Sequence, residues 1–377
     1  MTAMSQRPLA GLRVLDFSTL LPGPMCTLLL AEAGADVIKI ERPGQGDEMR
    51  TYEPRLGADS VNFALLNRGK RSLTLDLKQP DDLAAALELV DSADILVEQF
   101  RAGVMERLGL GAAQLRQRNP RLIYCSITGY GQSGPLASVA GHDLNYLAET
   151  GMLGLSTGVD GAPGLPQALI ADLAAGAYPA VMNILLALRH RDASGEGSTL
   201  DIAMTDNLFP LMYWGLGNGF STGLWPQPGA ERVTGGTPRY QVYRTADQRW
   251  LAVAPLEQKF WAQFLQILGA PELLDDSQDP TGVRAQVAQR IAAQPAAHWE
   301  AQFQGHDVCV SIVRELREAV DHPHFKARGL FQRSVQDRAS GKTIPALPVP
   351  IQPQFCAGDP HASFPSLGEA NQEFHRP

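Results

Sequence analysis

The sequence has little basic charge and few cysteines. It carries 32 Lys and Arg residues against 40 Asp and Glu, which gives a net charge of −8. No basic surface is implied, so we expect no nucleic-acid partner, whose phosphate backbone would need one. The four cysteines are widely spaced and form no C-x-x-C pair. This favours reduced thiols in a cytoplasmic protein over a disulfide framework or a metal site.

Targeting and membrane-spanning signals are also missing. Residues 1–8 lack the charged and apolar regions of a signal peptide. The longest apolar run, near residues 177–188, contains Pro179 and Asn183 and is shorter than the ~20 residues that cross a bilayer. The sequence therefore predicts a soluble protein with no membrane partner.

Common cofactor and protease motifs are absent as well. No G-x-G-x-x-G follows a predicted strand, and neither a P-loop nor H-E-x-x-H occurs. Residues 154–158 do match G-x-S-x-G, the pattern around a hydrolase serine. A nucleophile elbow needs a strand directly before it, whereas a helix-like segment precedes Ser156. We interpret this segment as a glycine-rich loop and expect no separate cofactor and no metal.

Strand-like and helix-like segments alternate through the first 130 residues. The expected strands cover residues 13–17, 37–41, 72–77, 95–98 and 122–127. The expected helices between them cover residues 24–33, 80–91 and 104–108. This alternation predicts an α/β fold with a Rossmann-like parallel sheet, in which ligands bind beyond the carboxyl ends of the strands.

The second half of the chain predicts a smaller α+β domain. Residues 143–190 are mainly helical in pattern, and a glycine- and proline-rich stretch covers 220–238. A β-hairpin is expected from 240–245 and 250–254, followed by helices near 257–268, 283–293 and 297–303. From Lys342 onward, prolines recur too often for regular structure.

Basic residues gather near the expected ends of the first strands. They are Lys39, Arg42, Arg50, Arg68, Lys70, Arg71, Lys78, Arg101 and Arg107. In an acidic protein, this clustering indicates a phosphate-bearing ligand. The alternative for each residue is a solvated basic face.

One histidine and two carboxylates lie in sequence motifs that suggest fixed rather than solvated side chains. They are His142 in Gly-His-Asp, Asp172 in Ala-Asp-Leu, and Glu257 in Leu-Glu-Gln. An imidazole and a carboxylate that face each other across a bound carbon could move a proton from one face of that carbon to the other. The alternatives are a structural role for His142 and helix capping by Asp172 or Glu257.

The chain resembles the family III CoA-transferases, and most closely their alpha-methylacyl-CoA racemase branch. The similar motifs lie at residues 8–16, 21–24, 34–43, 68–73, 103–109, 121–124, 128–132, 141–143, 235–240 and 307–310. Residues 46–50, Gly-Asp-Glu-Met-Arg, are somewhat similar to a transferase segment.

The resemblance implies a CoA thioester substrate and an interlocked homodimer. It implies a large CoA-binding domain over residues 1–200, to which a tail over 326–377 returns, a linker over 201–224 and a small domain over 225–325. The active site would lie where the large domain of one subunit meets the small domain of the other. Coenzyme A would enter as part of the substrate, with its phosphates held by Arg42, Lys78, Arg101 and Arg107.

The resemblance also assigns roles to the three candidate catalytic residues. His142 and Asp172 would racemise a 2-methylacyl-CoA by 1,1-proton transfer through an enolate, joined by Glu257 of the partner's small domain. Asp172 would then need a raised pKa, which burial among Leu169, Ile170 and Leu173 could supply. The alternative is a CoA-transferase in which Asp172 is the nucleophile and forms an acyl anhydride and then an aspartyl-CoA thioester. A third class is a thioester hydrolase or a non-catalytic CoA-binding protein.

Overall fold

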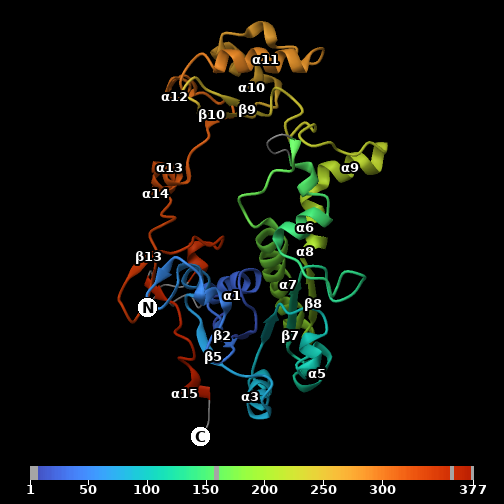
Figure 1. Ribbon diagram of the computed structural model, residues 1–377, viewed down its shortest axis with the longest axis vertical. Coiled ribbons are helices and arrows are strands. Elements are labelled where there is room, and N and C mark those ends of the chain that lie inside the picture. The colour runs from blue at the N-terminus through green and yellow to red at the C-terminus, as the bar shows by residue number, and fades with distance from the viewer. Residues whose placement is uncertain (1–6, 157–160, 357–360, 375–377) are drawn as a thin grey trace. The chain divides into compact units, whose positions relative to one another are not determined.

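The computed structural model describes residues 7–156, 161–356 and 361–374 and divides the chain into two compact units (Figure 1). Unit 1 contains residues 1–150, 166–211 and 328–377. Unit 2 contains residues 151–165 and 212–327.

A six-stranded sheet forms the centre of unit 1, and all its paired strands are parallel. Along the chain its strands are β1 (Arg13–Asp16), β2 (Asp36–Glu41), β5 (Arg71–Thr74), β6 (Ile95–Glu98), β7 (Ile123–Thr128) and β8 (Thr199–Ala203). Their order in the sheet, β5-β2-β1-β6-β7-β8, is that of a doubly wound Rossmann fold. The predicted α/β class and parallel sheet are confirmed, although the sequence did not indicate β8.

Helices cover both faces of this sheet because its strands are apolar on both sides. On one face, Leu15, Ile38 and Leu96 pack with residues of α3 (Pro80–Asp91) and α5 (Ala112–Arg118). On the other face lies α1 (Pro22–Glu32), which is buried along its whole length. The shorter helices of unit 1 are α2 (Val61–Asn67), α4 (Val104–Arg107), α6 (Asp143–Glu149) and α8 (Met204–Leu208). Two-residue strands β3 (Arg55–Leu56) and β4 (Asp59–Ser60) pair beside them.

A long continuous helix corrects one expectation from the sequence. A π-helical segment, Ala171–Ala177, runs directly into α7 (Tyr178–Ser194). Pro179 lies inside this helix and does not break it, because the Ala175 carbonyl, which Pro179 cannot reach with an N–H, accepts instead from Asn207 Nδ2 at 2.9 Å. The 24 helical residues are long and apolar enough to cross a membrane by length and composition, whereas the sequence predicted too short a run. This is weak evidence for a span, because core helices pass the same test.

Unit 2 contains a three-stranded antiparallel sheet in the order β11-β10-β9. The predicted hairpin is present as β9 (Gln241–Arg244) and β10 (Trp250–Val253), with β11 (Val310–Ile312) added at one edge. Its core joins aromatic side chains such as Trp261, Phe264 and Trp299. These side chains come from the predicted helices α10 (Gln258–Leu268) and α12 (Ala296–Phe303), and α11 (Pro280–Ile291), also predicted, adds valine and isoleucine side chains. Outside this core lie α9 (Tyr213–Thr222), α13 (Leu316–Asp321) and α14 (Pro323–Ala327).

The C-terminal segment has more regular structure than its prolines predicted. Strands β12 (Ser334–Gln336), β13 (Thr343–Pro345) and β14 (His361–Ser363) form a small sheet, and α15 covers Asn371–Phe374. Pro345 is tolerated because it ends an edge strand, where its missing N–H disturbs little pairing. The segment is tied to β5, since the Ala370 N–H donates to the Ser72 carbonyl at 2.9 Å.

The segment predicted as a linker begins inside regular structure. Residues 201–203 complete β8, and α8 follows directly. Both elements belong to unit 1, which continues to Leu211.

Candidate functional site

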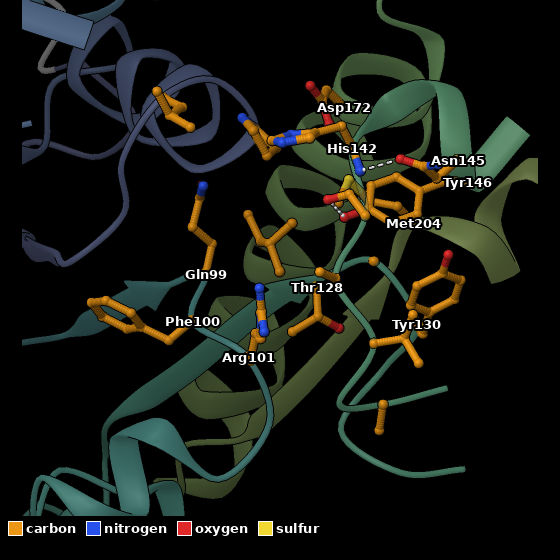
Figure 2. Close-up of a pocket in the computed structure, with 18 of the residues that line it drawn as sticks. Gln99, Phe100, Arg101, Thr128, Tyr130, His142, Asn145, Tyr146, Asp172 and Met204 are labelled. Atoms are coloured by element: carbon orange, nitrogen blue, oxygen red, sulfur yellow. Dashed lines mark hydrogen bonds between the residues drawn. The ribbon is translucent and has the colours of Figure 1, made fainter. Parts of the chain in front are cut away.

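A cavity of about 550 Å³ opens in unit 1 beyond the carboxyl ends of its central strands (Figure 2). Thr19 and Leu20 follow β1, and Gln99, Phe100 and Arg101 follow β6. The strand order reverses between β1 and β6, which is where ligands bind in doubly wound sheets. The start of α6, Asp172 and Met204 complete the lining.

The structure brings His142 and Asp172 to the same cavity. His142 occupies the N-cap position of α6, where its own N–H donates to Asn145 Oδ1 at 3.0 Å. The His142 carbonyl in turn accepts the Asn145 N–H at 2.8 Å. The backbone of His142 is therefore held, while its exposed side chain lines the cavity.

Asp172 lies within the first turn of the π-helical segment, so it is not the N-cap that the sequence allowed. Its backbone N–H instead donates to the carboxylate of buried Asp143 at 3.0 Å. In Figure 2, Asp172 and His142 lie together near the top of the view.

The pKa of Asp172 is raised to about 7, mainly by burial and secondarily by the charge of Asp143. The pKa is raised, as proton transfer requires. The predicted cause, burial among Leu169, Ile170 and Leu173, is wrong in part. Leu169 is 48% exposed, and burial comes instead from packing of the π-helical segment against α1, α6 and α8. A carboxyl group with this pKa is about half protonated at neutral pH.

Several cavity residues carried no clear signal in the sequence. The Tyr146 hydroxyl donates to the Gly141 carbonyl at 2.5 Å, and its ring meets that of Tyr130 edge to face. Burial, with a smaller contribution from Asp172, raises the pKa of Tyr146 to about 12. The Gln99 side chain accepts the Gly23 N–H at 2.9 Å and thereby joins the β1 and β6 loops. Only the positions of Gln99 and Tyr130 after predicted strands could have indicated them.

Of the four residues assigned to coenzyme A, Arg101 lines the cavity. Arg42, Lys78 and Arg107 are exposed and stand outside its lining. The Arg42 Nε donates to the Gly46 carbonyl at 3.1 Å. Their role toward the CoA phosphates stays a prediction.

The other five basic candidates are paired with carboxylates of unit 1. Their ion pairs are Lys39–Asp47, Arg50–Glu41, Arg68–Glu32, Lys70–Asp16 and Arg71–Asp36. The first four basic side chains are buried, so neither a phosphate site nor a solvated face describes them, whereas Arg71 is partly exposed. A buried charge of this kind is compensated by an internal carboxylate instead of by a ligand.

Glu257 lies in unit 2, at the N-cap position of α10. Its side chain is exposed and makes no capping hydrogen bond. The capping alternative is therefore not supported. Its catalytic role stays a prediction.

Ser156 does not sit on a nucleophile elbow. It follows a short 3₁₀ helix, Leu153–Leu155, and its hydroxyl donates to the carbonyls of Leu153 and Gly164 at 2.7 and 2.9 Å. Thr157 and Gly158 of the motif lie outside the described residues. Among the residues described, no three His, Cys, Asp or Glu side chains are grouped to hold a metal ion.

The fold and this cavity define a doubly wound α/β protein with a cavity at the switch point of its sheet. The CoA-transferase family III model matches residues 9–371, and the chain belongs to this family.

Relatives in the family carry out two kinds of reaction. The chain is 37% identical to human alpha-methylacyl-CoA racemase, with 97% of this chain and 92% of that protein aligned. It is 34% identical to acetyl-CoA:oxalate CoA-transferase of Acetobacter aceti, over 95% of this chain and 92% of that protein. The crystal structure of Rv3272 from Mycobacterium tuberculosis superposes with a TM-score of 0.84 at 30% identity and covers 98% of this chain and 99% of its own. Family membership therefore leaves the particular reaction open.

Proposed function

We propose that the protein racemises 2-methylacyl-CoA thioesters by 1,1-proton transfer. The observation that carries this proposal is an aspartic acid with a pKa near 7 in the same cavity as a histidine. A general acid or base works best when its pKa is close to the working pH. Asp172 meets this condition in unit 1 without any contribution from unit 2.

The two side chains would act on opposite faces of the α-carbon. Neutral His142 removes the α-proton of one enantiomer, and the electrons move onto the thioester oxygen to form an enolate. Protonated Asp172 then delivers its proton to the other face of the same carbon. The reverse reaction starts from ionised Asp172 and protonated His142, so both residues must exchange protons near neutral pH.

We propose that coenzyme A is held as part of the substrate, with no additional cofactor. Arg101 is the basic residue best placed for this role, since it lines the cavity beside Phe100. Arg42, Lys78 and Arg107 would contact phosphates further from the reacting carbon.

A homodimer is part of the same proposal. Large apolar side chains are exposed in both units. In unit 1 they lie on α7 and residues 209–211, and include Tyr178, Met182, Leu185, Leu186, Phe209 and Leu211. In unit 2 they lie on and beside α9, and include Tyr213, Trp214, Phe220, Leu224 and Trp225. Exposed apolar surface of this kind is typical of a surface that another chain covers. In an interlocked dimer, the partner's small domain would bring its Glu257 to the His142 side of the cavity.

The second candidate is CoA transfer with Asp172 as the nucleophile. It is favoured by the likeness to a CoA-transferase, and a carboxyl group with a pKa near 7 is also about half ionised at pH 7. In that reaction the Asp172 carboxylate attacks the thioester carbonyl and expels the CoA thiolate, which attacks the Asp172 carbonyl of the resulting anhydride and releases the donor acid. The acceptor carboxylate then attacks the aspartyl-CoA thioester and expels the thiolate. The thiolate attacks the acyl carbonyl of this second anhydride, which gives the new acyl-CoA and frees Asp172. His142 has no required proton to move.

One experiment separates the two reactions. The pure protein is incubated with a 2-methylacyl-CoA in deuterated water, with and without candidate carboxylic acids, and the CoA species are followed by mass spectrometry. Deuterium at the α-carbon without added acid supports racemisation. New acyl-CoA species that need an acid, with no deuterium uptake, would replace it with transfer.

His142→Ala gives a second separation. Racemisation predicts that this variant no longer interconverts the two enantiomers, whereas transfer can persist. His190→Ala is the matched control, because His190 is an exposed histidine on α7 outside the cavity lining. Interconversion retained in His142→Ala would rule out the two-base mechanism.

A further inference from the structure

The loop between β1 and α1 forms one wall of the cavity, through Thr19 and Leu20. Leu20 has a φ of 60°, in the left-handed region that a leucine rarely adopts. A residue keeps such a conformation only where surrounding contacts hold it, and these positions cluster at functional sites. The contacts that hold Leu20 are therefore relevant to how the cavity is built.

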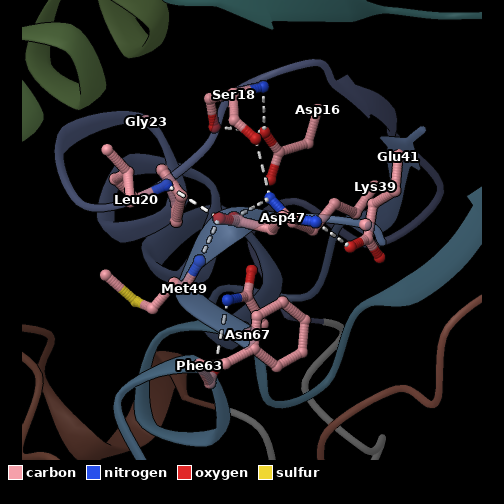
Figure 3. A network of polar contacts seen from close by, with 12 residues as sticks. Asp16, Ser18, Leu20, Gly23, Lys39, Glu41, Asp47, Met49, Phe63 and Asn67 are labelled. Atoms are coloured by element: carbon pink, nitrogen blue, oxygen red, sulfur yellow. Dashed lines mark hydrogen bonds and ion pairs between the residues drawn. The ribbon is translucent and has the colours of Figure 1, made fainter. Parts of the chain in front are cut away.

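A buried group of charges lies directly behind this loop (Figure 3). Asp16 Oδ1 accepts the Ser18 N–H at 3.0 Å, and Lys39 Nζ donates to the Ser18 carbonyl at 2.7 Å. Two residues further on, the Leu20 N–H donates to Asp47 Oδ1 at 3.2 Å. The side chain that reaches Leu20 thus comes from the segment after β2, far from the loop in the sequence.

Asp47 is itself tightly fixed. It is 1% exposed, forms an ion pair with Lys39 at 3.0 Å and accepts the Met49 N–H at 3.0 Å. Its own N–H donates to Glu41 Oε2 at 2.9 Å. A carboxylate held by two contacts, on a residue whose backbone N–H is also bonded, can impose a geometry on a neighbouring loop, because its position does not adapt to the loop.

We propose that Asp47 is a positioning residue, which holds Leu20 in its left-handed conformation and so fixes the Thr19–Leu20 wall of the cavity. Asp47 does not line the cavity and touches no substrate in this proposal. Its effect passes through one backbone hydrogen bond. This assigns a role to the Gly-Asp-Glu-Met-Arg segment, which proton transfer by His142 and Asp172 does not use.

Loss of this bond would let Leu20 relax toward an ordinary negative φ. The wall would then move relative to Gln99, which is bonded to Gly23 at the end of the same loop. Misplacement by about 1 Å is enough to slow a reaction strongly, because reacting groups must meet in a narrow geometry. The expected result is a lower kcat more than a higher KM.

The test combines two substitutions of Asp47 with two of Leu20. Asp47→Ala removes the acceptor, and Asp47→Asn keeps a carbonyl oxygen that can still accept the Leu20 N–H. Leu20→Gly permits a positive φ without strain. Leu20→Ala also removes most of the leucine side chain, but its Cβ keeps the strain of the positive φ. Each Asp47 variant is measured alone and in both Leu20 backgrounds, by the rate of α-deuterium exchange into a 2-methylacyl-CoA.

Asp47→Ala is expected to lower kcat about tenfold in the native and Leu20→Ala backgrounds. The loss is expected to be smaller for Asp47→Asn than for Asp47→Ala. In the Leu20→Gly background, the loss caused by Asp47→Ala is expected to shrink to about twofold or less. Equal losses from Asp47→Ala in the Leu20→Gly and Leu20→Ala backgrounds, or no loss from it in any background, would overturn the proposal. If Asp47→Ala does not fold, Asp47→Leu, which also lacks the acceptor, is judged by the same comparison.

A second readout does not depend on the reaction. Only the interpretation of kcat rests on the proposed function, so backbone hydrogen exchange of the peptide containing Leu20 is measured by mass spectrometry in the free protein. Faster exchange in Asp47→Ala than in the native protein supports the proposal even if no racemisation is found, and unchanged exchange overturns it. Asp59→Asn is the control, because Asp59 pairs with Arg50 beside the same cluster and makes no contact with the loop.

Discussion

Asp16, which is fully buried, and Asp172, which is half-buried, are two carboxyl groups of unit 1 whose pKa values shift in opposite directions. Burial alone would raise the pKa of Asp16, but Lys70 and Lys39, with hydrogen bonds from Ser18 and Thr27, lower it well below its usual range. Asp172 lines the cavity, and burial together with the charge of Asp143 raises its pKa to about 7. The two regions differ in the sign of the nearest charge.

This difference separates a carboxylate that holds structure from one suited to chemistry. Around Asp16, the buried anions Glu41 and Asp47 are matched by Lys39, Arg50 and Lys70, so each ion has a compensating partner. Asp172 has no such compensation, and its neighbour Asp143 carries the same charge. A carboxyl group left with a pKa near neutrality in a cavity is typical of a catalytic site.

The largest expected effect comes from removing the acid at Asp172. Asp172→Asn keeps the shape of the side chain and takes away its titratable proton, so interconversion of the two enantiomers is expected to fall by about 10³-fold, since acid–base catalysis contributes up to about 10⁴-fold. Asp206→Asn, on the neighbouring helix α8 and outside the cavity, is the control. A rate of interconversion within about tenfold of the native rate would contradict the role of Asp172.

Removing one charge from the compensated group around Asp16 is expected to lower the stability of the fold. Lys70 Nζ lies 3.1 Å from Asp16 Oδ2 and both side chains are fully buried, so Lys70→Met leaves an underpaired anion inside the protein. The free energy of unfolding is expected to fall by about 3 kcal/mol in urea denaturation. Arg118→Met, which removes an exposed partner of Asp91, should leave the denaturation midpoint nearly unchanged. If both substitutions lower the free energy of unfolding by similar amounts, the buried ion pair contributes no more to stability than the exposed one.

The raised pKa of Asp172 also predicts a pH dependence of stability. Between its ordinary pKa of 3.8 and the folded value of about 7, the folded protein binds more protons than the unfolded chain. Stability from this residue is therefore present at low pH and lost as pH rises toward 7. Relative to the native protein, Asp172→Asn should gain about 2 kcal/mol between pH 5 and pH 8. Chemical denaturation at both pH values checks this, and a pH-independent difference would contradict the raised pKa.

The smallest expected effect concerns the negative charge of Asp143, which distinguishes the surroundings of Asp172 from those of Asp16. Asp143→Asn removes the nearby negative charge, and its amide oxygen can still accept the Asp172 N–H. The pKa of Asp172 should fall by about one unit but stay above its usual range, because burial is the larger cause. The pH profile of α-proton exchange would then move about one unit toward acid. His142, Tyr146 and Arg101 line the same cavity and are left unchanged. A profile that does not move would mean that Asp143 acts only through its hydrogen bond.

Much of the fold could be predicted from the sequence because local patterns encode it. The strands at β1, β2, β5, β6 and β7 are short buried runs separated by helical segments. Strand β8 has the mixed burial of an edge strand and gave no such run. Residues 143–190 were predicted to be mainly helical, but the continuity of the helix through Pro179 was not, because its π-helical first part packs against α1 and α8.

The candidate site was predicted unevenly for a similar reason. His142, Asp172 and Arg101 carry chemically distinctive side chains, and the structure brings them to one cavity. Lys39 and Lys70 carry equally distinctive side chains but are fully buried with carboxylates. The sequence could not separate these sets, because whether a cation meets a ligand or an internal anion depends on contacts between distant segments.

The sequence by itself determined the family, the parallel α/β sheet and the residue types available for proton transfer, because these follow from ordered motifs and local apolar patterns. Only the tertiary structure decided which charges are compensated and which are not. It brought Asp143 to the Asp172 backbone and Asp47 to the Leu20 backbone. A pKa and a strained loop conformation are set by such contacts, since electrostatic and steric effects act over a few ångströms in space, whatever the separation along the chain.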